Sequence, residues 1–187
     1  MLAAIHNSSG FVLWLLGPTS SGKTTIAQLL LNLLRKNGIP VLHYDGDEVR
    51  DFFGDNLSFE SSDRLRVVGT LTHLANKATS AGVDAVVSAL TANEDAREHI
   101  RENIPNLITC YVKCSIETCI SRDPKGLYGM AKRGEINTLI GINEDYVAPK
   151  NPDIVINTER HSAAEALDIL VAYLYKNNCI SQLSISE

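Results

Sequence analysis

The chain has 187 residues, of which 44% are hydrophobic, and it carries a formal net charge of −5. An acidic chain lacks the basic face of a general nucleic-acid binder, so we expect no nucleic-acid partner. Because no apolar run approaches the roughly 20 residues needed to cross a bilayer, we expect no membrane partner either. This length and composition predict one globular domain.

The first apolar segment, residues 11–16, runs directly into a glycine-rich loop and lacks the basic segment and cleavage site of a signal peptide. We interpret it as a strand that is buried on both faces. The four cysteines form no C-x-x-C pair and have no histidine at metal-ligand spacing, which predicts free structural thiols. With no export signal, these features predict a cytoplasmic protein.

Strand and helix patterns alternate along the chain. Strand patterns cover residues 11–16, 41–44, 83–90, 107–113 and 154–156. Helical patterns cover residues 23–37 and 93–103. A long helical segment is capped by Ser61 or Ser62 and ends near residue 82, and a shorter one runs from the cap Ser115 to about Arg122. A capping box of Ser162 and Glu165 opens the last helix. This order predicts parallel β-α-β units.

The expected fold is therefore α/β, with three layers and a parallel central sheet. We expect the domain to span residues 11–176, with loose tails at residues 1–10 and 177–187. Residues 123–152 have weak periodicity and many polar, glycine and proline residues. In sheets of this kind ligands bind beyond the carboxyl ends of the strands, which is where we look for chemistry.

Residues 17–24, Gly-Pro-Thr-Ser-Ser-Gly-Lys-Thr, match the phosphate-loop motif G-x-x-x-x-G-K-S/T after a strand and before a helix. The glycines let successive backbone N–H groups face phosphate oxygens, and the helix adds the positive end of its dipole. Lys23 is expected to reach the β- and γ-phosphates, and the Thr24 hydroxyl to bind Mg²⁺. The predicted ATP-binding residues are Gly17, Pro18, Thr19, Ser20, Ser21, Gly22, Lys23, Thr24 and Thr25.

The remaining motifs disfavour two classes of phosphate-loop protein, GTPases and ATPases with a carboxylate at the end of the third strand. Asp51 and Gly54 match the D-x-x-G switch of GTPases but follow no strand, and residues 76–79 fail the N-K-x-D motif. The third strand pattern leads into Thr91 rather than into the carboxylate of an ATPase, because its acid, Asp84, lies at the other end. A kinase for a small molecule is the class that remains.

Asp45, Gly46 and Asp47 follow the second strand pattern and supply the missing carboxylates. A glycine between two acids allows both to approach the phosphate site, where one can orient a Mg²⁺-bound water and the other can accept a hydroxyl proton. Kinases also need a mobile cover that excludes water and supplies cations. Residues 122–128 and 132–135 are basic and rich in glycine, and they fit such a lid at about residues 122–142.

These motifs together resemble the adenylyl-sulfate kinase family over about residues 11–160. The matching segments are GPTSSGKT at 17–24, DGDEVR at 45–50, SFESSDR at 58–64, RDPKGLYGMAKRGEI at 122–136 and GINEDYVAPKNPD at 141–153. The resemblance implies a P-loop kinase fold with a helical lid, commonly a homodimer. It also implies phosphorylation of the ribose 3′-hydroxyl of adenylyl sulfate by ATP, which yields ADP and 3′-phosphoadenylyl sulfate.

By the same resemblance, residues can be assigned roles. The implied catalytic residues are Lys23, Asp45, Asp47 and Lys125; the implied metal ligands are Thr24 and Asp47; the implied acceptor-binding residues are Asp45, Asp47, Arg50, Phe59, Arg64, Thr91, Lys125 and Leu139. Arg50 and Arg64 would bind anionic groups of the acceptor nucleotide, and Phe59 would stack on its base. Lys125 would close over the acceptor from the lid.

The chain departs from the family pattern on the acceptor side. Val67 replaces the Asn that contacts the acceptor, Gly69 and Thr70 replace a basic pair, Thr91 replaces a Ser, and Leu139 replaces a Phe of the lid. Loss of an amide donor or of half an aromatic sandwich costs on the order of 1 kcal/mol each. Three alternatives follow: weaker use of adenylyl sulfate, a different nucleotide such as a cytidine derivative, or a nucleotide-binding protein without catalysis.

Overall fold

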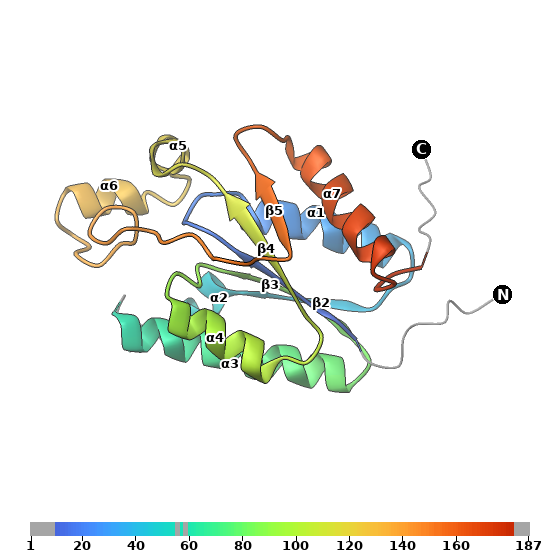
Figure 1. Ribbon diagram of the computed structural model, residues 1–187. Helices are drawn as coiled ribbons and strands as arrows, with labels where there is room; N and C mark the ends of the chain where they lie inside the picture. Colours follow the sequence, from blue (N-terminus) through green and yellow to red (C-terminus); the bar gives the residue numbers. More distant parts are fainter. Residues whose placement is uncertain (1–9, 55–56, 58–59, 182–187) are drawn as a thin grey trace.

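A computed structural model of the chain describes residues 10–54, 57 and 60–181. A five-stranded, fully parallel sheet has the order β2-β3-β1-β4-β5, with helices on both faces (Figure 1). The strands are β1 (Val12–Leu16), β2 (Val41–Asp45), β3 (Asp84–Ala89), β4 (Leu107–Lys113) and β5 (Ile154–Asn157). The helices are α1 (Lys23–Lys36), α2 (Gly46–Phe53), α3 (Ser61–Ser80), α4 (Glu94–Asn103), α5 (Ile116–Arg122), α6 (Leu127–Lys132) and α7 (Ala163–Lys176).

β1 lies at the centre of the sheet, and all five of its residues are buried. Successive side chains of a strand point to opposite faces, so β1 supplies both layers of the core. Leu13 and Leu15 pack with α1 and α7 on one face, whereas Trp14 and Leu16 pack with α3 and α4 on the other. The predicted three-layer α/β fold is confirmed, and the carboxyl end of β1 delivers the phosphate loop to the middle of one edge.

A third apolar cluster lies under the lid, where α5, α6 and the following segment meet. Its buried members are Cys114, Cys119, Tyr128, Ala131, Ile136 and Leu139. The Tyr128 hydroxyl donates to the carbonyl oxygen of Thr19 at 3.1 Å, which ties the lid to the phosphate loop. The predicted helical lid is therefore packed against the site rather than detached from it.

The cysteines are free, as predicted, and three of them are buried. Burial raises the pKa of the Cys110 thiol and of the Cys119 thiol to about 12 in each case. Thiols that stay protonated are poor nucleophiles and poor metal ligands. The prediction of packing roles for these two residues is consistent with their surroundings.

Two short helices, α2 and α6, lie in segments for which no helical pattern was detected. α2 has eight residues, begins at a glycine directly after β2 and has no fully buried side chain, although Val49, Phe52 and Phe53 have the spacing of a helical stripe. α6 has six residues, which is less than two turns. The expected caps Ser115 and Ser162 are confirmed, and Ser162 forms the capping box with Glu165.

The cap expected for α3 was wrong. The helix begins at Ser61 and its N-cap residue is Glu60, so neither Ser61 nor Ser62 holds the capping position. The expected terminal tails fall mostly outside the described residues, although Ile180 is buried in the core beside α7. Within the described ranges, no helix is both long and apolar enough to cross a membrane.

Candidate active site

A cavity of about 620 Å³ opens at the carboxyl ends of the strands and gathers most of the predicted site residues. Thirteen of them line it: Thr19, Ser20, Gly22, Lys23, Thr24, Thr25, Asp45, Asp47, Arg50, Arg64, Thr91, Lys125 and Leu139. Gly17, Pro18 and Ser21 of the phosphate loop do not line the cavity. Phe59 lies outside the described residues.

The phosphate loop turns sharply between β1 and α1. A Cβ atom at Gly17 would lie 2.5 Å from the Val112 carbonyl oxygen, so only glycine lets the loop pass this close to β4. Ser20 and Gly22 have φ angles of 63° and 102°, and Gly22 is the N-cap of α1. The Ser20 hydroxyl oxygen has no hydrogen-bond partner among the described residues. A buried polar atom without a partner beside a cavity fits a site for a polar ligand.

Lys23 folds back on the turn that precedes it. Its Nζ donates to the carbonyl oxygens of Gly17 at 2.9 Å and Pro18 at 2.8 Å. Burial lowers the pKa of Lys23 to about 8, although the negative charges of Asp47 and Asp45 act in the opposite direction. The ammonium group is thus poorly hydrated, and a bound anion would favour its charged form.

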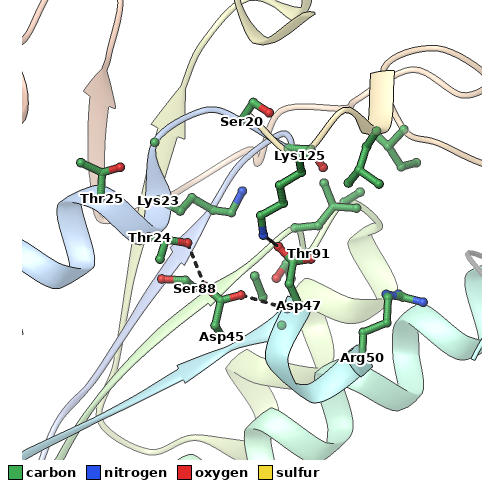
Figure 2. A pocket seen from close by; sticks show the side chains of 18 of the residues that line it. Ser20, Lys23, Thr24, Thr25, Asp45, Asp47, Arg50, Ser88, Thr91 and Lys125 are labelled. Carbon is green, nitrogen blue, oxygen red and sulfur yellow. Dashed lines mark hydrogen bonds and ion pairs between the residues drawn. The ribbon is translucent and has the colours of Figure 1, made fainter. Parts of the chain in front are cut away.

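Asp45 ends β2 and is buried, and each of its carboxylate oxygens has a distinct partner (Figure 2). One oxygen accepts from the backbone N–H of Asp47 at 2.9 Å and so caps α2, while the other accepts from the Thr24 hydroxyl at 2.8 Å. The cap fixes the carboxylate at the strand end, and the second bond places it beside the first turn of α1. Two hard oxygen donors therefore lie next to the phosphate loop.

Asp47 points instead toward the lid, where it forms an ion pair with Lys125 (Figure 2). Burial disfavours the charged form of Lys125, but the hydrogen bond and the charge of Asp47 outweigh this and raise the pKa of Lys125 above its ordinary value. Both side chains are about half exposed, at 50% and 57%, so the pair is accessible from the cavity. The lid lysine and the second aspartate thus meet at the middle of the site.

The acceptor side carries one buried cation that already has partners. Arg64 of α3 is 7% exposed and donates to a Glu144 carboxylate oxygen at 2.9 Å and to the Thr138 carbonyl oxygen at 2.6 Å. Its guanidinium therefore holds the segment that follows the lid. Val67 and Leu139, at 5% and 4% exposure, form part of an apolar wall of the cavity.

Thr91, just beyond β3, is held in an unusual conformation. Its φ of 42° is a genuine outlier for a β-branched residue. The hydroxyl oxygen accepts from the indole N–H of Trp14 at 2.9 Å, and the residue is 4% exposed. The hydroxyl is thus engaged within the protein, although the residue borders the cavity.

The residues around the exit of β5 were missed by the sequence reasoning. Arg122 donates to the carbonyl and hydroxyl oxygens of Thr158 at 2.8 Å and 3.1 Å, and the Thr158 hydroxyl donates to the Ser21 carbonyl oxygen at 2.9 Å. His161 and Ser162 line the same end of the cavity. Their position after a strand was the available signal, because ligands collect at strand ends.

A glycine-rich loop with its lysine at the end of the central strand, two strand-end aspartates and a packed helical lid define a P-loop kinase. The profile of the family described as adenylylsulphate kinase matches residues 9–157. The chain is 35% identical over 176 residues to the adenylyl-sulfate kinase of Chloroflexus aurantiacus, covering 94% of this chain and 95% of that protein. It is 36% identical over 151 residues to the probable adenylyl-sulfate kinase of Archaeoglobus fulgidus, covering 81% and 97%.

A solved structure gives the same result. The Mycobacterium tuberculosis APS kinase CysC, in complex with AMPPNP and APS, superposes with a TM-score of 0.81 at 30% identity, covering 88% of this chain and 98% of that one. The chain belongs to the adenylyl-sulfate kinase family, whose members are ATP-using phosphotransferases with an alcohol group as acceptor. The resemblance inferred from the motifs is confirmed.

The lowered pKa of Lys23 predicts a pH dependence of nucleotide affinity. In the free protein Lys23 loses its proton near pH 8, whereas a bound triphosphate favours the charged form. ATP affinity is therefore expected to fall as the pH rises above about 8, and binding near that pH should take up a proton. Isothermal titration at several pH values, in two buffers of different ionisation enthalpy, measures both quantities.

The matched control is Lys23→Arg, which keeps its charge throughout this range. Only the slope of its ATP affinity against pH is compared with the wild type, and that slope should be flat. An equal decline in both proteins, or binding without proton uptake, would contradict the assignment to Lys23. Lys23→Ala is expected to abolish turnover, because the phosphate loop then loses the cation that it places at the β- and γ-phosphates.

Proposed function

We propose that the protein transfers the γ-phosphoryl group of ATP to the ribose 3′-hydroxyl of adenylyl sulfate, with Mg²⁺, giving ADP and 3′-phosphoadenylyl sulfate. The observation that carries this proposal is the continuity of one cavity. The phosphate loop and Asp45 line one part of it, and Arg64 and Leu139 line another. Lys125 and Asp47 lie between Lys23 and Arg50 in the view of Figure 2. Donor and acceptor can therefore meet in one cavity.

The triphosphate is placed by the loop itself. Backbone N–H groups of residues 19–24, at the N-terminus of α1, would face the phosphate oxygens, and Lys23 would transfer its hydrogen bonds from the Gly17 and Pro18 carbonyls to them. The adenine of ATP then lies toward Arg122 and Thr158, at the exit of β5. The Mycobacterium tuberculosis relative, solved in complex with both AMPPNP and APS, supports simultaneous binding of the two nucleotides.

The residues present fit Mg²⁺. No group of three or more His, Cys, Asp or Glu side chains suited to a metal occurs in the part of the chain that the structure describes. Mg²⁺ requires no such cage, because it is commonly held by one or two carboxylates together with substrate phosphates and water. Thr24 and Asp45, 2.8 Å apart, supply hard oxygens beside the loop. When bound, the ion neutralises charge on the transferring phosphoryl group.

This arrangement refines the roles proposed for the two aspartates. Asp45 contacts Thr24 and is the better placed metal-side carboxylate, whereas Asp47 contacts Lys125 and faces the lid. We assign to Asp47 the hydrogen bond from the acceptor hydroxyl, whose proton it accepts during transfer. Lys125 then stabilises the charge of the phosphoryl group from the lid side.

Direct in-line transfer is favoured over a phosphorylated protein intermediate. The Thr91 hydroxyl is the group at the position where a phosphate carrier would be sought. It is buried and accepts a hydrogen bond from Trp14. Phosphorylation there would have to break this bond and force a doubly charged group into a packed site.

The acceptor side supports a nucleotide with less specific contacts to its base. Val67 and Leu139 offer aliphatic surface rather than an amide or an aromatic ring, so they pack against a base without reading its edge. Arg50 and Arg64 supply the positive charge for the anionic part of the nucleotide. Adenylyl sulfate fits this division of contacts.

A homodimer and a cytoplasmic location complete the proposal. Phe52 of α2 is 85% exposed and Leu65 of α3 is 42% exposed, and exposed apolar side chains on adjacent helices suit a contact between subunits. The free thiols suit a reducing compartment. Sedimentation of the purified protein at several concentrations tests the assembly.

A coupled assay of ADP release with a panel of nucleotide acceptors tests the proposed reaction. Release with adenylyl sulfate, and the 3′-phosphorylated product by mass spectrometry, is the expected result. Release only with another nucleotide, such as a cytidine derivative, would show that this nucleotide is the acceptor and adenylyl sulfate is not. Absence of release with every nucleotide, despite ATP binding, would indicate a nucleotide-binding protein without catalysis.

Asp47→Asn should lower kcat by roughly 10²- to 10⁴-fold, because an amide cannot accept the acceptor proton. The fold and ATP binding should be preserved, since the side chain is more than half exposed. The matched control is Asp51→Asn, on the same helix and outside the cavity. Its kcat should stay within about twofold of the wild type. Near-normal kcat in Asp47→Asn would remove Asp47 from the mechanism.

Val67→Asn should raise kcat/KM for adenylyl sulfate by about tenfold, because one hydrogen bond to the acceptor is worth on the order of 1 kcal/mol. Val67→Ala is the control that changes volume without adding an amide. Steady-state kinetics with adenylyl sulfate at saturating ATP distinguish the two. An unchanged or lower kcat/KM in Val67→Asn would show that the acceptor does not lie against this position.

A further inference from the structure

Arg97 of α4 is a guanidinium group buried to 1% exposure, and it is not among the residues that line the cavity. Burial of a charge is unfavourable unless the group is paired and hydrogen-bonded throughout. Arg97 therefore has a role that its neighbours should reveal. It was absent from the residues predicted from sequence.

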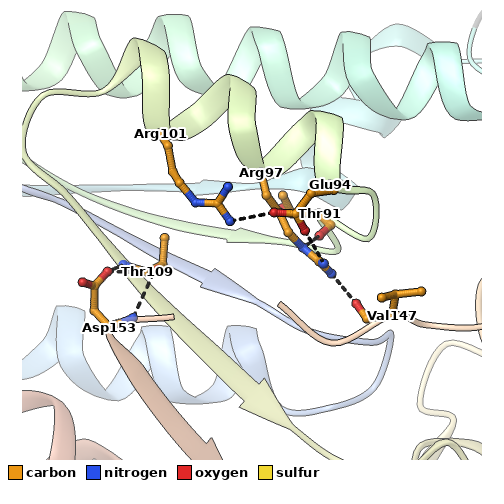
Figure 3. Close-up of polar contacts among 7 residues, drawn as sticks. All are labelled: Thr91, Glu94, Arg97, Arg101, Thr109, Val147 and Asp153. Atoms are coloured by element: carbon orange, nitrogen blue, oxygen red, sulfur yellow. Dashed lines mark hydrogen bonds and ion pairs between the residues drawn. The ribbon is translucent and has the colours of Figure 1, made fainter. Parts of the chain in front are cut away.

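The guanidinium joins three separate segments (Figure 3). Its Nε donates to the Thr91 carbonyl oxygen at 3.0 Å, and one terminal nitrogen donates to the Val147 carbonyl oxygen. The other terminal nitrogen donates to a Glu94 carboxylate oxygen at 3.3 Å on its own helix. The planar fork of an arginine is suited to holding several acceptors at fixed separation.

The ring of Tyr146 also packs against the Arg97 guanidinium. The Arg97 guanidinium carbon lies 5.7 Å from the centre of that ring, and the ring stacks on Tyr111 of β4 at 6.1 Å with an interplanar angle of 13°. A cation over an aromatic face is attracted to it. The segment that returns from the lid is thus anchored to the sheet through Tyr146 and to α4 through Arg97.

Arg97 holds carbonyl groups of two segments that contribute to the cavity lining: Thr91 lines the cavity itself, whereas Val147 lies further along the segment whose residues 138–140 line it. Residues 90–93 beyond β3 form one wall, and residues 138–140 form another, on the segment that continues to Val147. Thr91 keeps its strained φ of 42° between two constraints, the Arg97 bond to its carbonyl and the Trp14 bond to its hydroxyl. Strained residues that persist are those that their surroundings over-determine.

Arg64 holds the same return segment at its other end, through Thr138 and Glu144. Two arginines on two helices therefore fix a segment whose residues face the acceptor. Arg64 borders the cavity and can contact the acceptor directly, whereas Arg97 lies behind the wall. Arg64 can therefore bind the acceptor, whereas Arg97 can act on it only through the residues that it holds.

We propose that Arg97 is a positioning residue for the acceptor half of the cavity, because it fixes the carbonyl group of Thr91, which lines the cavity, and that of Val147, on the segment that continues from residues 138–140. The inference rests on the proposed function, because it takes the acceptor to lie against these two segments. ATP contacts the phosphate loop and the exit of β5, neither of which touches Arg97. Loss of the Arg97 hydrogen bonds should therefore weaken binding of the acceptor and leave binding of ATP unchanged.

The test compares Arg97→Lys with Arg101→Lys. Lysine keeps the charge but loses the planar fork, so it cannot hold both carbonyl groups in the same geometry. Arg101 lies on the same helix, is 40% exposed and pairs with Glu94, and it serves as the matched control. We expect Arg97→Lys to raise KM for adenylyl sulfate by about tenfold, with KM for ATP unchanged. Arg101→Lys should leave both KM values within about twofold of the wild type.

A second pair of variants changes the surroundings of Arg97 without replacing its buried charge. Tyr146→Leu removes the ring beneath the guanidinium, and Tyr146→Phe keeps it. KM for adenylyl sulfate should rise in the first and stay near the wild-type value in the second. If Arg97→Lys fails to fold, this pair decides the question, with ATP titration and thermal melting as measures of folding.

The outcomes separate the inference from the proposed function. Wild-type protein that uses adenylyl sulfate, with an unchanged acceptor KM in Arg97→Lys or Tyr146→Leu, would overturn the inference alone. A parallel rise in both KM values, in proportion to lost thermal stability, would reduce Arg97 to a structural role and would also overturn it. Absence of turnover in the wild type would remove both proposals.

Discussion

The ammonium group of Lys23 is enclosed by the turn that precedes it, and the rest of the site depends on this arrangement. Two backbone carbonyl groups hold it at the end of the central strand, and its pKa is lowered to about 8 by loss of water. Such an environment favours an anion as a binding partner, because an anion restores the charged form. The close passage of Gly17 by β4 keeps the turn tight enough for this contact.

The other polar groups extend outward from that point along one edge of the sheet. Asp45 accepts hydrogen bonds from Thr24 in the first turn of α1 and from the backbone at the start of α2. Asp47 forms an ion pair with Lys125 in the lid. Arg64 and Arg97 fix the segment that follows the lid. The ends of β1, β2, β3 and β5 each lead into residues that line the cavity, in agreement with the general rule for parallel sheets. Divergence at Val67 and Leu139 changes the acceptor wall without disturbing this framework.

The fold and the donor half of the site could be predicted from the sequence because local chemistry determines them. The glycines, lysine and threonine of the phosphate loop form a recognisable motif, and the central strands β1 and β3 are buried on both faces and largely apolar. α2 was missed although Val49, Phe52 and Phe53 have helical spacing, because the helix has only eight residues and follows β2 without an intervening loop. Arg97 and Glu144 could not be predicted, since their bonds to Val147 and Arg64 join segments that are far apart in the sequence. Only the tertiary structure brings such groups together.

A crystal structure of the protein with a non-hydrolysable ATP analogue and Mg²⁺ tests the central claim most directly. The account predicts phosphate oxygens against the backbone amides of residues 19–24, with the Lys23 ammonium displaced from the Gly17 and Pro18 carbonyl oxygens onto them. A nucleotide bound elsewhere, with Lys23 still on both carbonyl groups, would contradict it.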